Sequence, residues 1–288
     1  MYRYLLHNGR VQEASERSLS AGQTGVMNGW GVFSTIRVCE GTLFAWPRHW
    51  ARMRRDAALL HVPFPGNETA VLAALHSLIE ANQAPEATLR LVVVRNRGGL
   101  FEGPLIERDF DWFAFLAPIA EWAASARLGV KHNARHAASE FSGVKVCSWA
   151  FNLTWYEEAH ARGFDEVVLL NERGEVGECT SANLFAVFGD VAATPPLDSG
   201  CLPGVTRALL LEEARVPGIR VEERTLRLED LERAGGVFLT SSTRDVMPVS
   251  SIDGLHIGQS FTVAHALGDE LKRLRRQWVE QHAARTAG

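Results

Sequence analysis

The most informative stretch of this 288-residue chain is residues 142–149, Ser-Gly-Val-Lys-Val-Cys-Ser-Trp. Its lysine, Lys145, lies among small and apolar residues, just before a segment with helical periodicity. Such surroundings remove water from an ammonium group and favour the neutral, nucleophilic amine. The chain has 27 arginines but only three lysines, so this lysine is a candidate for chemistry that a guanidinium cannot perform. The alternative is a lysine whose stem crosses an apolar surface to reach water.

The other two lysines have simpler explanations. Lys272 belongs to a basic run on the polar face of the last predicted helix, and Lys131 stands at a strand end beside His132. We expect both to be solvated. His132 and His136 are four residues apart with no third ligand nearby in the sequence, so we expect no metal site.

Composition narrows the classes of function. With 46% apolar and 22% charged residues the chain is globular, and a net charge of −4 gives no reason to expect nucleic acid or an anionic membrane as partner. There is no signal-peptide pattern and no apolar run of about 18 residues, and the four cysteines are widely spaced. We therefore expect a cytoplasmic protein with free thiols that acts on small molecules.

Strand and helix patterns alternate along the chain, which predicts an α/β (α+β) fold. The first half contains a hairpin signal at Asn8-Gly9 and a helix that Asn67 could cap. Apolar and β-branched runs predict strands over 32–38, 89–94, 112–117, 167–170 and 183–187, and helical spacing predicts helices from Trp50 and over 151–162.

The pattern lapses into alanine and serine between Pro118 and Arg127, which is typical of a linker. We expect an N-terminal α/β domain over 1–120, an interdomain linker over 121–127 and a C-terminal cofactor-binding domain over 128–288.

Three further segments suit a phosphorylated aromatic cofactor. Glu178 could hold a protonated pyridine nitrogen if Lys145 carries pyridoxal phosphate. Residues 202–207, Leu-Pro-Gly-Val-Thr-Arg, form a glycine turn into a helix, and residues 240–243, Thr-Ser-Ser-Thr, form a hydroxyl-rich turn. Both offer hydrogen-bond donors to a phosphate. Taken singly, a surface glutamate and two ordinary capped loops explain these segments equally well.

Taken in order, these segments resemble the fold-type IV pyridoxal-phosphate enzymes, the class IV aminotransferase family of branched-chain and D-amino-acid aminotransferases and aminodeoxychorismate lyase. The resemblance covers nearly the whole chain and begins at residues 28–37, whose Phe-Ser-Thr-Ile-Arg is similar to the family pattern F-E-T-x-R or F-E-G-x-R. Residues 49–53 resemble its H-x-x-R-L helix, and residues 163–185 resemble the block that carries the pyridine-binding glutamate. Residues 202–207 resemble its L-P-G-[IV]-T-R segment.

This resemblance implies a smaller N-terminal α/β domain, a larger C-terminal α/β pseudo-barrel domain, pyridoxal 5′-phosphate as cofactor and a homodimer. It implies that Lys145 forms the Schiff base, that Glu178 contacts the pyridine nitrogen, and that Arg52 and the turns at 202–207 and 240–243 bind the phosphate. The implied cofactor-binding residues are Arg52, Lys145, Glu178, Ser181, Leu202, Val205, Thr206, Ser242 and Thr243.

Departures from the family concentrate on the substrate side. Phe33 replaces the tyrosine of D-amino-acid aminotransferases, which disfavours strict D-specificity, and Ser34 stands where the family has glutamate. Thr35 matches a threonine common in aminodeoxychorismate lyases. Arg97, and Arg95 beside it, could bind a substrate carboxylate or could be solvated charges at a strand end. The expected substrate-binding residues are Phe33, Thr35 and Arg97.

We therefore expect a pyridoxal-phosphate-dependent aminotransferase that moves an amino group from an amino acid of branched-chain type to a 2-oxo acid through Lys145. Aminodeoxychorismate lyase activity, which yields 4-aminobenzoate and pyruvate, is the alternative at the same site. A non-catalytic binding protein is the third hypothesis. The joint retention of Lys145, Glu178 and Arg52 argues against it, because a binding module needs no proton-transferring amine.

Overall fold

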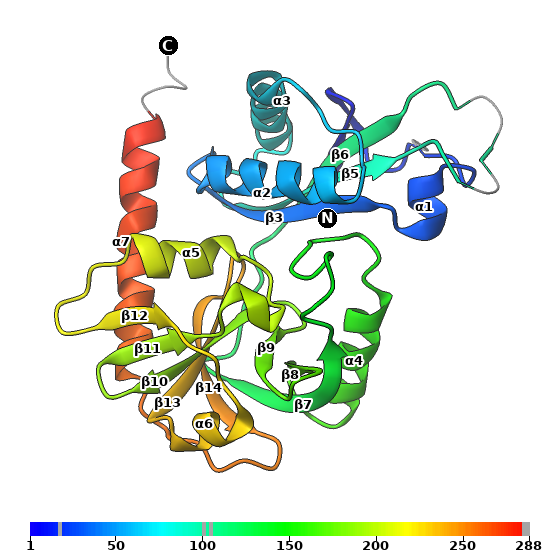
Figure 1. Ribbon diagram of the computed structural model, residues 1–288. Helices are drawn as coiled ribbons and strands as arrows, with labels where there is room; N and C mark the ends of the chain where they lie inside the picture. The colour runs from blue at the N-terminus through cyan, green and yellow to red at the C-terminus, as the bar shows by residue number, and fades with distance from the viewer. Residues whose placement is uncertain (17–18, 100–101, 104–105, 284–288) are drawn as a thin grey trace. The chain divides into compact units, whose positions relative to one another are not determined.

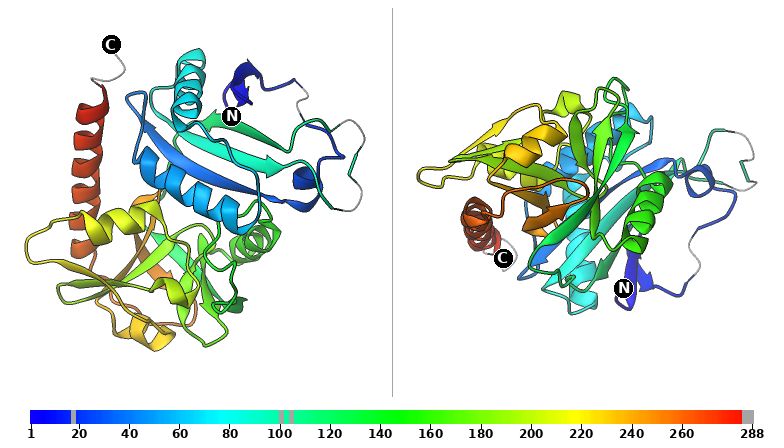
Figure 2. Two further views of the ribbon diagram at one scale, coloured as in Figure 1. Left: turned by 45° about the horizontal axis from the view of Figure 1, so that its top comes forward. Right: turned by 90° about the horizontal axis from the view of Figure 1, so that it is seen from below.

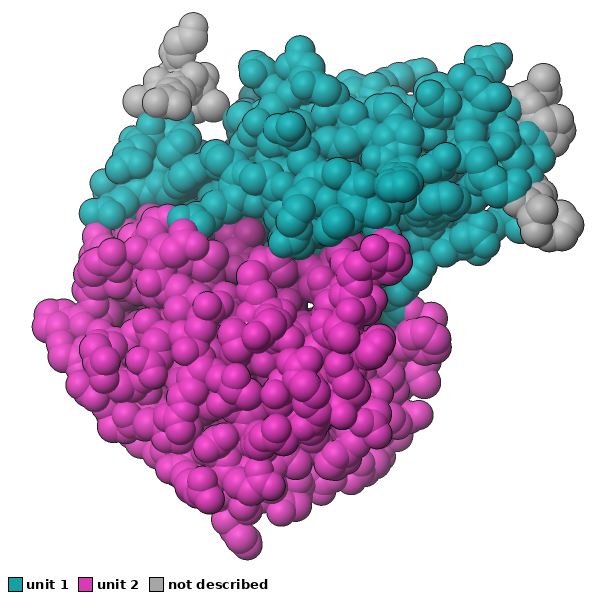
Figure 3. All heavy atoms as spheres, viewed as in Figure 1, with its two compact units in different colours: residues 1–120, 145–149, 277–288 teal, residues 121–144, 150–276 magenta. Residues whose placement is uncertain are grey.

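The computed structural model describes the chain except residues 17–18, 100–101, 104–105 and 284–288 (Figure 1). The chain forms two compact units (Figure 3). Unit 1 comprises Met1–Ala120, Lys145–Trp149 and Gln277–Gly288, and unit 2 comprises Glu121–Val144 and Ala150–Arg276. Two segments of unit 1 therefore follow the predicted linker in the sequence. The predicted domains, 1–120 and 128–288 joined by 121–127, stay a prediction.

Unit 1 is built on a six-stranded antiparallel sheet with the strand order β2-β1-β6-β5-β3-β4. Its strands are β1 (Tyr4–His7), β2 (Arg10–Glu13), β3 (Gly31–Cys39), β4 (Thr42–Leu43), β5 (Ala87–Arg95) and β6 (Phe110–Ala117). The predicted hairpin between β1 and β2 is confirmed. Asn8 and Gly9 take φ angles of 48° and 86°, the left-handed region that these two residue types tolerate best.

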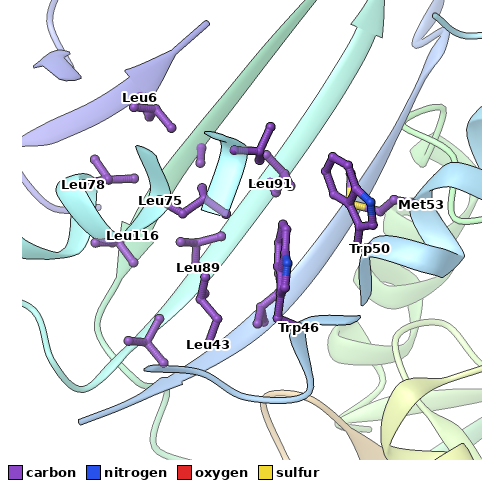
Figure 4. Packing of buried hydrophobic residues seen from close by; sticks show 14 of the residues in the cluster. Leu6, Leu43, Trp46, Trp50, Met53, Leu75, Leu78, Leu89, Leu91 and Leu116 are labelled. Carbon is purple, nitrogen blue, oxygen red and sulfur yellow. The ribbon is translucent and has the colours of Figure 1, made fainter. Parts of the chain in front are cut away.

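Two helices of unit 1, α2 (Trp46–Leu59) and α3 (Glu68–Ala81), pack against one face of this sheet, and the short helix α1 (Thr24–Asn28) precedes β3. The predicted cap is confirmed, because Asn67 Oδ1 accepts a hydrogen bond of 3.0 Å from the Ala70 N–H. Figure 4 shows the core between helices and sheet, in which Trp50 and Met53 of α2 and Leu75 and Leu78 of α3 cluster with Leu89 and Leu91 of β5.

The other face of the same sheet is also apolar. Side chains alternate between the two faces of a strand, so Phe33 points away from the core that holds Val32 and Ile36. Phe33 packs with Val92 and Val94 of β5 in a second, smaller cluster. This second face of β3 and β5 is where the predicted substrate-side residues Phe33 and Thr35 lie.

Unit 2 contains an eight-stranded mixed sheet with the order β12-β11-β10-β13-β14-β7-β8-β9. Its strands are β7 (Ala126–Arg135), β8 (Glu166–Asn171), β9 (Val176–Cys179), β10 (Asn183–Phe188), β11 (Val191–Thr194), β12 (Arg220–Glu223), β13 (Gly236–Ser241) and β14 (Asp245–Ile252). Strand β7 pairs in parallel with both β8 and β14, and β11 pairs in parallel with β12. The strands twist and curl into a half-barrel (Figure 2).

Helices cover both faces of the unit 2 sheet. They are α4 (Ala150–Ala161), α5 (Val205–Glu212), α6 (Leu228–Arg233) and α7 (Thr262–Ala283), with the short 3₁₀ turn η1 (Leu197–Ser199). Leu231 of α6 belongs to the core on one face, whereas Leu210 of α5 and Leu267 of α7 belong to the core on the other. In that second core Phe185 and Phe238 stack with ring centroids 4.8 Å apart.

The predicted mixed α/β class is therefore confirmed, as are the strands over 32–38, 89–94, 112–117, 167–170 and 183–187. In the predicted linker region, β7 already begins at Ala126. Among the described residues, no helix is long and apolar enough to cross a membrane.

We predict that Leu89→Ala, which empties a fully buried position, destabilises the protein by about 2–5 kcal/mol. Leu59→Ala is the matched control, because that side chain is 44% exposed and its loss should cost less than about 1 kcal/mol. Urea unfolding followed by tryptophan fluorescence measures both. Equal losses in the two variants would contradict the assigned core.

Candidate active site

Hydrogen bonds hold the backbone of Lys145 in unit 1. Its carbonyl accepts from the Phe33 N–H at 3.2 Å, and the Cys147 N–H donates to the Gly31 carbonyl at 2.9 Å, so the segment adds a short bridge to β3. On its other side the Lys145 N–H donates to Asp56 Oδ2 of α2 at 3.1 Å, and Asp56 is fully buried. Strand β3 and helix α2 thus fix the main chain from which the candidate amine projects.

The side chain of Lys145 lies beside an aromatic ring and a second cation. Its Nζ is 4.5 Å from the ring centroid of Phe33, and the guanidinium of Arg90 is 4.7 Å from the same centroid. Burial raises the pKa of the nearby Cys147 thiol to about 12, so this thiol stays protonated and is no competing nucleophile at neutral pH.

Arg90 was missed by the sequence analysis. It stands opposite Thr35 in the β3–β5 pair and therefore shares a sheet face with Thr35 and Phe33. Burial lowers its pKa. The sequence did contain a signal for it. Arg90 is the single charged residue within the apolar strand run 89–94, and burying a charge costs free energy unless the charge is paired.

Arg97, in contrast, lies beyond the end of β5. About half of its side chain is exposed, at 51%, and it pairs with Glu102 and Asp109. Arg95 stacks on Trp30 and donates to the Arg97 carbonyl at 2.7 Å. The roles of Phe33, Thr35 and Arg97 in substrate binding stay predictions. Phe33 and Thr35 lie on the sheet face that carries Arg90, and Arg97 lies beyond it.

Arg52 projects from α2 toward β3. Its Nη2 donates to Ser34 Oγ at 2.8 Å, and Ser34 Oγ lies 2.8 Å from Nδ1 of His49. Burial lowers the pKa of Arg52 to about 10, which still leaves a full positive charge at neutral pH. Burial, and then the charges of Arg52 and Lys145, lower the pKa of His49 well below its usual value. Ser34 and neutral His49 therefore fix a cation without adding negative charge, which suits a site for an anionic ligand.

In unit 2, Glu178 is the last residue but one of strand β9 and is 9% exposed, so the surface-glutamate alternative does not apply. Each carboxylate oxygen has a donor: Arg135 Nε donates to Oε1 at 2.9 Å, and the Leu202 N–H donates to Oε2 at 3.0 Å. Arg135 also donates to Asn152 Oδ1 at 3.2 Å, and Asn152 donates to the Thr180 carbonyl at 2.8 Å. This network fixes the orientation of the carboxylate.

The segment after Leu202 turns into helix α5. Gly204 is required at the turn, because a Cβ there would collide with Oδ1 of Asn183, whose amide donates to the Leu202 carbonyl at 2.9 Å. Val205 and Thr206 form the first turn of α5 and are buried. The N–H groups in the first turn of a helix have no acceptor within the helix and favour anions such as phosphate.

Ser181 and the turn between β13 and β14 are tied together by Arg244. Its Nη1 donates to Ser181 Oγ at 2.7 Å, its main-chain N–H donates to Ser241 Oγ at 3.0 Å, and its guanidinium pairs with Glu166 at 3.3 Å. Ser242 and Thr243 lie in this turn, and both are partly buried. The structure thus brings Ser181 to the hydroxyl-rich turn, which is about 60 residues away in the sequence.

Two residues of unit 2 escaped the sequence analysis. Arg135 and Arg244 are largely buried and hold the candidate site residues, yet each is one arginine among 27. Neither stands in a regular spacing with the glutamate that it contacts. Only their long-range pairing, which local sequence does not encode, distinguishes them.

Comparisons with known proteins identify the family of this chain. The family model described as amino-transferase class IV matches residues 31–252. The chain belongs to the class IV aminotransferases. Proteins of this family use pyridoxal phosphate, so the cofactor expected from the sequence is confirmed.

Individual relatives cover nearly the whole chain. A D-alanine aminotransferase of Bacillus licheniformis is 29% identical over 88% of this chain and 90% of its own length. A branched-chain-amino-acid aminotransferase of Salmonella typhimurium is 26% identical over 89% of this chain and 87% of its own. The fold matches that of a branched-chain aminotransferase from the archaeon Thermoproteus uzoniensis, solved with norvaline. That structure is 22% identical, with a TM-score of 0.87 over 97% and 98% of the two chains.

The donors and acceptors of this class IV aminotransferase fit pyridoxal phosphate. In unit 1, the primary amine of Lys145 suits an aldehyde and the guanidinium of Arg52 suits a phosphate. In unit 2, the fixed carboxylate of Glu178 suits a protonated pyridine nitrogen, and the start of α5 and the turn around Ser242 offer N–H and O–H donors that suit a phosphate. Thr240 Oγ1, beside that turn, is buried with no hydrogen-bond partner among the described residues.

The burial of His49 makes the stability of the protein depend on pH. The unfolded chain takes up a proton on this histidine below a pH of about 6.5, whereas folded His49 stays neutral. Stability contributed by neutral His49 is therefore present above that pH and is lost as the pH falls, by about 1.4 kcal/mol per pH unit.

We predict that His49→Asn, which cannot take up this proton, flattens the fall in stability between pH 7 and pH 5. Urea unfolding at both pH values measures the effect. His132→Asn removes an exposed histidine and should leave the slope of the wild type unchanged. Identical slopes in the wild type and His49→Asn would contradict a neutral His49.

Proposed function

We propose that this class IV aminotransferase transfers the amino group of a branched-chain or similar apolar amino acid to a 2-oxo acid such as 2-oxoglutarate. The observation that carries the proposal is the sheet face beside Lys145, which combines apolar Phe33 and Val92 with the guanidinium of Arg90. An apolar substrate side chain suits Phe33 and Val92, and a substrate carboxylate suits Arg90. The branched-chain aminotransferase names among the relatives support the same substrate class.

Pyridoxal phosphate supplies an aldehyde that condenses with amines and an aromatic ring that withdraws electrons from the bonds at the substrate Cα. Lys145 is the catalytic residue in this proposal. Its amine would hold the cofactor aldehyde at rest and, once free, would serve as the base that moves the proton of the substrate Cα. The backbone bonds to Phe33 and Asp56 keep the main chain that carries Nζ in place during both roles.

Glu178 holds the proton of the pyridine nitrogen in this proposal. Its carboxylate accepts hydrogen bonds from Arg135 and from the Leu202 N–H, and these two bonds prevent it from rotating. Its negative charge would therefore stay directed at the pyridine nitrogen. Leu202, whose N–H binds this carboxylate, would pack on the aromatic ring, and Ser181 would also contact the cofactor.

Arg52, the start of α5 and the β13–β14 turn hold the phosphate in this proposal. Arg52 contributes the charge, Val205 and Thr206 contribute main-chain N–H groups at a helix start, and Ser242 and Thr243 contribute hydroxyls. Anchoring the phosphate fixes the aldehyde end for reaction with the amine.

We also propose a homodimer. Helix α4 exposes Phe151, which is 75% exposed and stacks with Trp155, and Leu153, which is 49% exposed, and Phe141 in the segment before α4 is also 49% exposed. A second copy covering these side chains would remove them from water. None of the four cysteines, all of which the structure describes, forms a disulfide bond, which supports a reducing compartment and hence the cytoplasm.

We predict that the purified enzyme forms glutamate from 2-oxoglutarate with L-leucine, L-isoleucine or L-valine as donor, and that Lys145→Ala abolishes this turnover. Glutamate dehydrogenase coupling measures the product. Lys131→Ala, which removes an exposed lysine paired with Glu158, should retain the activity. If only D-alanine serves as donor, the proposed substrate class is wrong. If the enzyme makes 4-aminobenzoate and pyruvate from aminodeoxychorismate but forms no glutamate, it is a lyase and not an aminotransferase.

We predict that Arg90→Leu raises the KM of at least one carboxylate-bearing substrate about tenfold or more, since a charge-assisted hydrogen bond is lost. The KM values of L-leucine and 2-oxoglutarate show which carboxylate Arg90 binds. Both rise if it binds the α-carboxylate that the two substrates share, and only that of 2-oxoglutarate rises if it binds the second carboxylate. Arg3→Leu, which removes an exposed arginine paired with Glu13, is the matched control and should change KM little. Arg97→Leu tests the other arginine expected to bind a substrate carboxylate. A KM effect in Arg97→Leu but not in Arg90→Leu would reverse this assignment.

A further inference from the structure

Three side chains of unit 1 form a chain of hydrogen bonds that ends at Arg52. Ser34 projects from β3, and His49 and Arg52 lie one turn apart on α2. Arg52 Nη2 and His49 Nδ1 are each 2.8 Å from Ser34 Oγ. Ser34 is 0% exposed and His49 is 1% exposed, so water does not compete for these bonds.

The direction of the two hydrogen bonds follows from chemistry. A guanidinium can only donate, so Ser34 Oγ accepts from Arg52. The hydroxyl hydrogen of Ser34 then needs an acceptor, and His49 Nδ1 provides it if the ring is neutral with its proton on Nε2. The chain therefore runs from Arg52 through Ser34 to His49, with a donor and an acceptor in each bond.

A serine and a neutral imidazole hold a guanidinium differently from a carboxylate. Arg55, on the same helix, pairs with the buried carboxylate of Asp56. The charge of Asp56 also acts on Arg52 and raises its pKa, but the same carboxylate accepts from the Lys145 N–H. Ser34 and His49 fix the position of the Arg52 guanidinium and add no negative charge that would oppose an incoming anion.

We propose that Ser34 and His49 are positioning residues that orient Arg52 as the ligand of the cofactor phosphate. The inference rests on the proposed role of Arg52 in phosphate binding. It explains why a serine suits this strand position: the hydroxyl is both an acceptor for Arg52 and a donor to a neutral imidazole.

The test compares the binding of pyridoxal phosphate with that of pyridoxal, which has the aldehyde and ring but no phosphate. Apoenzyme is titrated with each compound, and the imine absorbance gives the two dissociation constants. Ser34→Ala should weaken pyridoxal phosphate about tenfold, the size expected for one lost hydrogen bond to a charged group, and should leave pyridoxal unchanged. Thr24→Val is the matched control, because it removes a buried hydroxyl of unit 1 that has no hydrogen-bond partner in the part of the chain that the structure describes.

A pair of variants at His49 tests the second bond. Asparagine can place Oδ1 near the position of the imidazole Nδ1 and accept from Ser34, whereas leucine cannot. His49→Asn should therefore retain the affinity for pyridoxal phosphate within about threefold, and His49→Leu should weaken it to the extent of Ser34→Ala. A loss of equal size in both variants would overturn the role of His49.

Arg52→Met separates this inference from the role on which it rests. If Arg52→Met keeps the preference for pyridoxal phosphate over pyridoxal, then Arg52 is not the phosphate ligand and that part of the proposed function fails. If Arg52→Met loses the preference but Ser34→Ala keeps it, only the positioning role is overturned. Equal weakening of both compounds by Ser34→Ala would mark a merely structural residue and would also overturn it.

Discussion

The hydrogen bond from the Lys145 N–H to the buried carboxylate of Asp56 is the constraint on which the candidate chemistry depends. Together with the bond from Phe33 to the Lys145 carbonyl, it holds a short segment, Lys145–Trp149, within unit 1, although the residues on both sides belong to unit 2. A lysine side chain has a flexible stem of four carbons, so a reactive amine is placed only as well as its main chain is fixed.

The same constraint brings the amine to a defined chemical surface. On this face of the unit 1 sheet the ring of Phe33 lies near both Lys145 and Arg90, and apolar Val92 and Val94 complete the cluster. The face that packs on α2 and α3 carries the stability of the unit, and the opposite face carries the residues that suit a substrate. Alternation along β3 and β5 is what allows one pair of strands to serve both purposes.

Local pattern in the sequence predicted much of the fold. The Asn8-Gly9 turn, the Asn67 cap and the buried strands depend on neighbours in the chain, and they were predicted correctly. The family was also predicted from the sequence and is confirmed by the matching family model, whereas the roles of Lys145 and Glu178 stay predictions. Sequence could not supply the partners of these residues, because the Lys145–Asp56 and Glu178–Arg135 contacts join positions 89 and 43 residues apart.

The arginine-rich composition explains which residues were hardest to find. With 27 arginines in the chain, the identity of Arg90, Arg135 or Arg244 carries little information, and only burial and partners distinguish them from solvated surface charge. The scarcity of lysine makes each of the three lysines informative, because arginine can replace a surface lysine but cannot condense with an aldehyde.

The central claim is that Lys145 is the amine that binds the cofactor, and one measurement tests it most directly. The enzyme loaded with pyridoxal phosphate is reduced with borohydride and digested, and mass spectrometry locates the pyridoxyl group. With only three lysines in the chain the answer is unambiguous. The account predicts about one label per chain, on Lys145, in keeping with the need for a primary amine at the cofactor aldehyde. A label on Lys131 or Lys272, or no label at all, would contradict it.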